Sequence, residues 1–169
     1  MATDLFSFID LYSRQLATAS HLLNKGAKFA AANGVSEADM LEWRLVDDMA
    51  PLRFQLAMVC NFAQAWPARV AGLPVPADAA DGLDVAGFQA AIAASKAWLA
   101  ARTPAEFADR DDAPLTFLIG NGMEPTLPSG QWLRVFATTN LFFHLSTAYA
   151  ILRAKGVQVG KPDMFAAGL

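Results

Sequence analysis

Apolar residues recur at intervals of three and four along most of this chain, a spacing that predicts amphipathic α-helices. The first such run covers residues 4–32, with Thr3 or Asp4 in the capping position before it. Asn33-Gly34 is expected to end this helix, because glycine readily adopts the left-handed conformation that closes helices. Ser36 is then expected to cap a short helix.

A second long helix is predicted to begin between Asp48 and Pro51, since proline is tolerated in a first helical turn. Its apolar stripe continues through Ala63, and we expect Pro67 to kink or shorten it before Gly72. The residues that follow, rich in proline, aspartate and glycine, are typical of a long loop.

The remaining pattern predicts two more helices and one hairpin. Asp84 is placed to cap the third long helix, and residues 115–119 and 123–127 form two short apolar segments around an Asn-Gly turn. The fourth long helix is expected over residues 131–155, closed by Gly156. We therefore predict an all-α fold: a four-helix bundle with a long crossover between the second and third long helices and a small β-hairpin before the fourth.

Composition favours one domain with a thick core. The 169 residues suffice for a single domain spanning 1–169, and 54% of them are apolar while 17% are charged. Soluble proteins usually carry about 25% charged residues. So few charges indicate that a partner covers part of the surface, and we expect a homodimer.

Charge and cysteine content narrow the function classes. A net charge of −3, with lysine and arginine scattered among acids, argues against nucleic-acid binding. The single Cys60 suits a reducing compartment, and the first residues do not resemble a signal peptide, so we expect a cytoplasmic protein. Residues 135–152 lack charge, but six of these 18 positions are polar, which is typical of an inner helix of a soluble fold and not of a membrane span.

The fourth helix carries polar groups on an apolar face. Asn140, His144 and Thr147 lie three and four residues apart, so their side chains are expected on one side of the helix. Imidazole and amide oxygen can hold a metal ion or polarise a ligand. They can equally hydrogen-bond each other, a backbone carbonyl or a water molecule in a structural network.

Near the second helix, Arg44, Asp48 and Gln55 follow at steps of four and seven residues. If this stretch is helical they share a face, and Asp48 could orient His144, as carboxylates often do for histidines. Alternatively Asp48 is an N-cap with Arg44 as its surface neighbour. Arg153, with Lys161, could fix an anionic group of a substrate or could cap the end of the fourth helix.

Several segments together resemble an uncharacterised family, a domain of unknown function within the DinB-like (DinB/YfiT-like) superfamily of proposed metalloenzymes. The matching segments are Asn140-Leu-Phe-Phe-His144, Thr147-Ala-Tyr-Ala-Ile-Leu-Arg153, Gly160-Lys161-x-Asp163, Asp48-Met-x-Pro-Leu with Gln55, and Ala68-Arg-x-Ala-Gly72.

The resemblance implies a four-helix bundle, often dimeric, that binds a divalent metal through three histidines, one near the second helix and two on the last long helix. Some enzymes of the superfamily are thiol-dependent transferases or isomerases. His144 matches one of these ligands, whereas Asn140 and Ala148 stand four residues to either side of it. On the second helix, Asp48 or Gln55 would take the place of the histidine.

Two hypotheses follow. In the first, Asp48, Gln55, Asn140 and His144 form a polar pocket that binds a small molecule or a weakly held divalent ion. As an enzyme it would be a metal-assisted transferase or hydrolase, with His144 as ligand or general base, Asp48 as its orienting carboxylate or second ligand, and Asn140 as a polarising group. In the second, a non-catalytic dimeric bundle acts through its interaction surface. A cavity that reaches His144 favours the first, and a sealed, fully bonded His144 favours the second.

Overall fold

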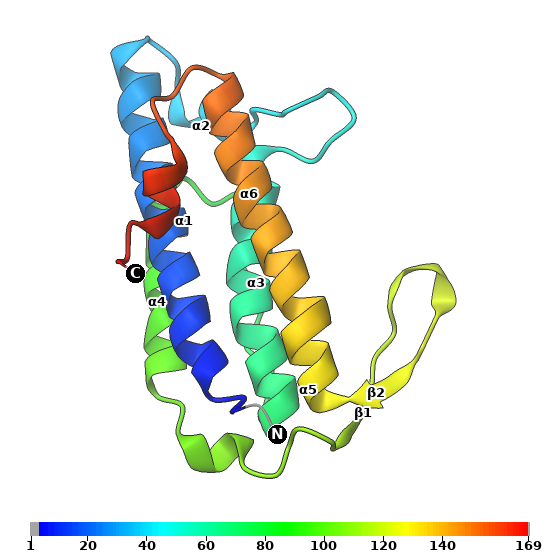
Figure 1. Ribbon diagram of the computed structural model, residues 1–169. Helices are drawn as coiled ribbons and strands as arrows, with labels where there is room; N and C mark the ends of the chain where they lie inside the picture. The colour runs from blue at the N-terminus through cyan, green and yellow to red at the C-terminus, as the bar shows by residue number, and fades with distance from the viewer. Residues whose placement is uncertain (1–3, 169) are drawn as a thin grey trace.

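The computed structural model describes residues 4–168, apart from the side chain of Asn121, and is predominantly helical (Figure 1). Its long helices, which lie alongside one another, are α1 (Ser7–Ala32), α3 (Leu52–Ala71), α4 (Val85–Ala100) and α6 (Thr138–Ala154). Helix α3 packs against α6 and α1 packs against α4, while α1 also contacts α3 and α6. The predicted helical fold with a hairpin before the last long helix is confirmed. Thr3, one of the two residues expected to cap the first helix, lies outside the described residues.

Shorter elements connect the long helices. They are α2 (Glu37–Leu41), η1 (Pro104–Phe107), β1 (Pro114–Thr116), η2 (Gly120–Gly122), β2 (Thr126–Pro128), α5 (Ser129–Gln131), η3 (Trp132–Ala137) and η4 (Lys161–Phe165). The long loop between α3 and α4 and the hairpin of β1 and β2 both project from the same side of the long helices (Figure 1).

Helix α3 does not stop at Pro67. It continues to Ala71 and ends at Gly72, which has a φ of 70°. The helix thus ends before Gly72 as predicted, and of the two expectations for Pro67, a kink or a shorter helix, the shorter helix is wrong. Pro67 and its neighbours Trp66 and Ala68 are all buried, and this burial outweighs the one backbone hydrogen bond that proline cannot donate.

The two strands of the hairpin pair over fewer residues than the sequence predicts. Strands β1 and β2 are antiparallel with Leu115 opposite Leu127, and Ile119 pairs separately with Met123. Pro125 has no backbone N–H, so the ladder is interrupted near it. The hairpin is attached to the helices by Trp132, whose Nε1 donates a hydrogen bond of 2.8 Å to the Leu115 carbonyl.

The helix that follows the hairpin contains a π-helical segment, η3, between α5 and α6, which the sequence pattern does not reveal. The backbone N–H of Thr138 bonds the carbonyl of Leu133, five residues earlier. That carbonyl also accepts hydrogen bonds from Thr138 Oγ1 at 2.9 Å and from the buried Tyr12 hydroxyl at 3.2 Å. These extra donors from α1 and α6 stabilise the wider turn, because each satisfies a polar group in the interior.

The helix over Ser129–Ala154 is, within the described residues, the one segment long and apolar enough to span a membrane by length and composition. A core helix of a soluble protein passes the same test. Leu141, Leu145 and Ile151 of this helix are fully buried, which explains its apolar character by packing against the other long helices.

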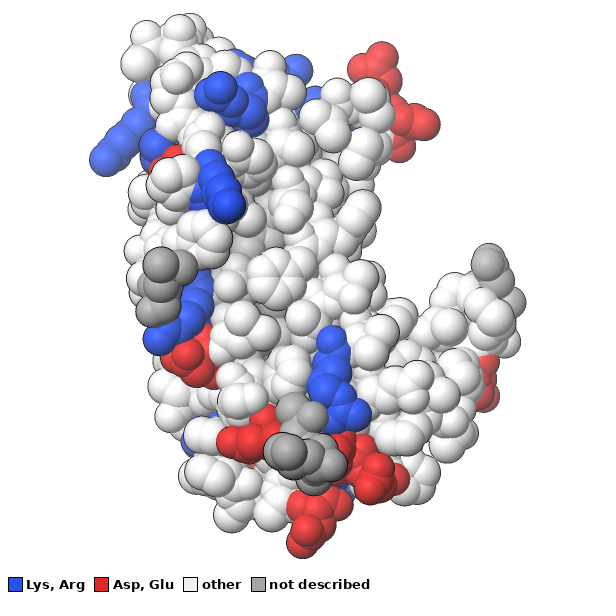
Figure 2. Space-filling view, in the orientation of Figure 1, with Lys and Arg blue, Asp and Glu red and all other residues white. Residues whose placement is uncertain are grey.

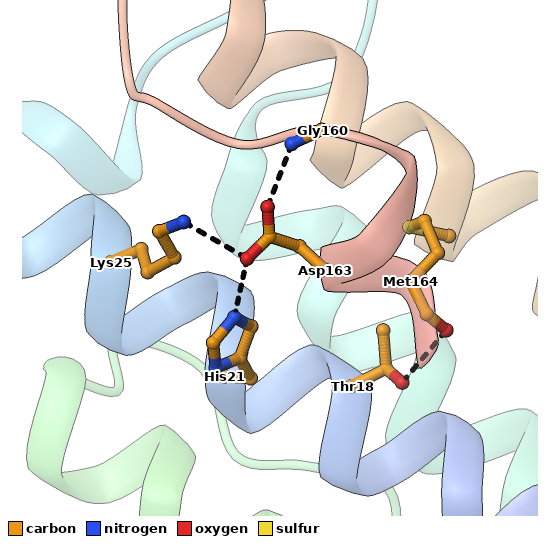
Figure 3. A network of polar contacts seen from close by, with 6 residues as sticks. All are labelled: Thr18, His21, Lys25, Gly160, Asp163 and Met164. Carbon is orange, nitrogen blue, oxygen red and sulfur yellow. Dashed lines mark hydrogen bonds and ion pairs between the residues drawn. The ribbon is translucent and has the colours of Figure 1, made fainter. Parts of the chain in front are cut away.

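The C-terminal segment is held on α1 by one carboxylate, Asp163 of η4 (Figure 3). Its Oδ1 lies 2.7 Å from Nε2 of His21 and 2.9 Å from Nζ of Lys25, and its Oδ2 accepts a hydrogen bond from the backbone N–H of Gly160. The hydrogen bonds from His21 and Lys25 hold the pKa of this carboxyl group well below its usual value. A second contact comes from Thr18, whose hydroxyl bonds the Met164 carbonyl.

We predict that Asp163→Asn lowers the free energy of unfolding at pH 7 by about 1–3 kcal/mol, because charge-assisted hydrogen bonds are lost. Since the folded state depresses the pKa of Asp163, its stabilisation is present above about pH 4 and is lost as the pH falls through the depressed value. Urea unfolding from pH 7 down to pH 2 measures the difference between wild type and variant, which should begin to shrink below about pH 4. The control is Asp10→Asn, which breaks a surface pair with Arg14 and should cost about 0.5 kcal/mol or less. Equal losses in the two variants would contradict the prediction.

Candidate functional site

His144 of α6 faces Gln55 of α3, and these two helices share the most extensive contact of the fold. The Nδ1 atom of His144 lies 2.8 Å from Oε1 of Gln55, and Nε2 of Gln55 donates a bond of 3.0 Å to the Ala50 carbonyl. Because that carbonyl fixes the orientation of the Gln55 amide, Oε1 must be the acceptor and His144 Nδ1 the donor. The Nε2 atom of the neutral ring therefore keeps its lone pair.

The surroundings of His144 are aromatic and largely dry. The side chain is 9% exposed, and burial lowers its pKa, which keeps the imidazole neutral near pH 7. The rings of Phe54, Phe62 and Phe143 lie 5.8, 5.9 and 5.2 Å from the imidazole, centre to centre. Its Nε2 has no hydrogen-bond partner among residues 4–168, yet it is not one of the fully buried unpaired atoms. This nitrogen is therefore neither bonded within the described chain nor fully sealed.

Asp48 and Arg44 do not take part in this arrangement. Both are exposed in the turns before α3, whose first residue is Leu52 and whose capping position is Pro51. Arg44 donates a hydrogen bond of 2.6 Å to the Met49 carbonyl. The expectations that Asp48 orients His144 or caps the helix are therefore wrong, because the helical spacing on which they depended does not extend before Leu52.

The other predicted polar residues bond within their own helix. Asn140 Nδ2 donates to the Phe136 carbonyl at 2.7 Å, and Thr147 Oγ1 donates to the Phe143 carbonyl at 2.8 Å, each four residues back. Arg153 is exposed in the last turn of α6, and Lys161 is exposed at the start of η4. Of the predicted pocket, the structure thus joins only His144 and Gln55.

This donor set does not fit the divalent metal that the family resemblance implies. Within the described part of the chain, no three His, Cys, Asp or Glu side chains lie close enough to hold an ion. Gln55 Oε1 is already bonded to the imidazole, and the amide nitrogen of Asn140 is committed to a backbone carbonyl. No chemical step can be built here on a metal held by these residues.

A cavity of about 580 Å³ lies beside the His144 site, between α3, the loop after it and the hairpin. The surface is hollowed between the projecting loop and the hairpin, which Figure 2 shows in profile. Apolar side chains form most of its wall, among them Met58, Phe62, Trp66, Phe117, Met123 and Phe136. Phe62 and Phe136 also pack together, and Phe62 separately packs on His144, so the cavity adjoins the His144 site without including it.

One cation and one acid line this cavity, Arg69 from the last turn of α3 and Asp78 from the loop. The Arg69 guanidinium carbon lies 5.2 Å from the Trp66 ring centre and 4.8 Å from that of Phe117. Burial lowers the pKa of Arg69, and Asp78 partly offsets this effect. The cavity is not predicted from the sequence, although Phe62, Trp66 and Arg69 recur at helical spacing, because the same spacing is typical of a core stripe.

Comparisons with known proteins agree with this architecture. A family model described as a domain of unknown function (DUF1993) matches residues 6–165. The chain is also similar to the crystal structure of a DinB family member protein from Shewanella denitrificans, at 29% sequence identity. That match has a TM-score of 0.79 and covers 92% of this chain and 88% of the other. No curated protein matches the chain.

We predict that the pKa of His144 lies below the ordinary histidine value of about 6.5, because burial disfavours the charged ring. In the neutral ring, Nδ1 should carry the proton, because Gln55 Oε1 accepts a hydrogen bond from it. Imidazole nitrogen chemical shifts measured by NMR against pH test both statements, with His21→Gln used to assign the signals. In Gln55→Glu the new carboxylate should raise the His144 pKa by about 1 to 3 units. An unchanged pKa in that variant would mean that the two side chains do not meet.

Proposed function

We propose that this chain, which belongs to the DUF1993 family and shares the DinB-like fold, is a small-molecule-binding protein whose ligand occupies the cavity beside α3. The observation that carries the proposal is the cavity of about 580 Å³ with apolar walls and a few polar groups. Binding sites for small molecules typically measure about 300–1,000 Å³ and have this composition. The single, buried Cys60 supports a reducing compartment, and we place the protein in the cytoplasm.

His144 supplies the chemistry that a bound molecule could use. It is neutral, its tautomer is fixed by Gln55, and Nε2 remains available on the side of the ring away from that bond. A ligand that extends past Phe62 would meet an acceptor suited to taking a proton, as a general base in a transferase or hydrolase does. Asp48 has no part in this proposal, because the structure leaves it exposed before α3.

A second role, an interface between two copies of the chain, is supported by exposed aromatic rings at the His144 site. Phe54 is 44% exposed and Phe143 is 56% exposed, and both rings pack on the imidazole. Exposed apolar patches of this kind commonly mark protein interfaces. A homodimer through this face would cover both rings.

We predict that the neutral fluorophore N-phenyl-1-naphthylamine binds the wild-type protein at one site, with increased emission in the apolar cavity. Ala65→Phe should weaken this binding about tenfold or more, because the new ring fills space at a residue that lines the cavity. Ala93→Phe, at an exposed position of α4, is the matched control and should bind as the wild type does. Absence of saturable binding to the folded wild-type protein would refute the proposed function.

For the interface, we predict that sedimentation velocity shows a dimer in the wild-type protein and mainly monomer in Phe54→Ser/Phe143→Ser, since two apolar anchors are removed. Phe165→Ser changes another exposed phenylalanine, 47% exposed and located on η4, and should leave the dimer unchanged. A wild-type monomer across the micromolar range would exclude this interface.

A further inference from the structure

We propose that the ligand of this cavity is an amphipathic anion, whose acid group binds Arg69 and whose apolar body extends along α3 toward Phe62. This inference rests on the proposed function and adds to it the chemical class of the ligand.

Arg69 is held in place without any acceptor from the described residues. It forms no ion pair and donates no side-chain hydrogen bond among the residues that the structure describes, and its neighbours are the ring faces of Trp66 and Phe117. A guanidinium has five N–H donors in a rigid plane and binds carboxylates or phosphates through two parallel hydrogen bonds. Packing against the two aromatic rings uses none of these donors, so they remain free for a ligand.

The charge of Arg69 is only partly compensated in the cavity. Asp78, the acid that shares the lining, is exposed on the loop and interacts with Arg69 through space, without direct contact. A partly buried cation that lacks a bonded counter-ion is unfavourable, because burial removes part of its hydration. An anion bound to Arg69 would relieve this cost, and Asp78 would oppose the anion by repulsion.

The cavity wall determines what must accompany the acid group. Apart from Arg69, Asp78 and one amide, Asn61, the wall is mainly apolar and aromatic, and it includes Trp66, Phe117, Ile119 and Met123. Arg69 and Phe62 are seven residues apart on α3, or about 10 Å along the helix axis. An extended chain of about eight carbon atoms spans this distance, so fatty acids of medium length and arylalkanoic acids match the site.

The experiment is displacement of N-phenyl-1-naphthylamine by decanoate, decyl sulfate and decan-1-ol, each below its micellar concentration. Arg69→Gln should weaken decanoate about tenfold or more while changing binding of the neutral fluorophore and of decan-1-ol by about twofold or less. Asp78→Asn should strengthen decanoate about two- to threefold, because a like charge is removed. Lys28→Gln, which removes a cation from an exposed position on α1, is the matched control and should leave all affinities unchanged.

The outcomes separate the two proposals. If the fluorophore and decan-1-ol bind but decanoate binds equally well to wild type and Arg69→Gln, the anion proposal is overturned and the cavity remains a binding site. If none of these compounds binds the folded wild-type protein, the proposed function itself fails. If Arg69→Gln does not fold, Asp78→Asn decides, since unchanged decanoate affinity in that variant overturns the anion proposal. If Arg69→Gln weakens binding of decanoate but not of decyl sulfate, the ligand's acid group is a carboxylate. If it weakens binding of both anions, any singly charged acid group is accepted.

Discussion

The stacking of Trp66 on Trp132 joins the parts of the molecule on which the cavity depends. Their ring centres lie 5.2 Å apart with planes inclined by 23°, and Phe136 packs edge-on against both rings. Trp66 belongs to α3, Trp132 to η3, and the indole N–H of Trp132 bonds the hairpin at Leu115. The hairpin contacts α3 through Phe117, which packs on Trp66 and Arg69, so its position relative to α3 follows from these aromatic contacts.

One face of α3 carries two chemically different environments. Gln55, Phe62 and Arg69 follow at intervals of seven residues, which places them on the same side of the helix. At one end Gln55 orients a neutral imidazole, and at the other Arg69 presents a cation between aromatic rings. Phe62 contacts the first environment and lines the second. A molecule bound along this face would therefore meet a proton acceptor and a positive charge at opposite ends.

Much of the fold could be predicted because helical periodicity and capping residues are local signals. Gly72 and Asp84 end and begin helices as their types suggest, with a left-handed φ at the first and a bond from Gly87 N–H to the carboxylate at the second. The site was predicted less well. His144 was identified as a polar group inside an apolar helix, but its assigned partner, Asp48, depended on where α3 begins, and helix starts are poorly determined by sequence. The cavity is lined by α3 and by residues of the hairpin some 50 positions later in the chain. No local sequence pattern predicts that these two segments lie side by side.

The π-helical segment also has a consequence for how this family can vary. A π-turn holds one residue more than an α-turn, so the helix before it is rotated by about 100° relative to the helix after it. Deleting one residue from Trp132–Ala137 would leave His144 opposite Gln55 but would turn Trp132 away from Trp66 and swing the hairpin with it. The length of this segment, together with the packing of Trp132 and Phe136 within it, sets the direction of the hairpin. Among related sequences, an insertion here and a hairpin that lies beside α3 should therefore be gained or lost together.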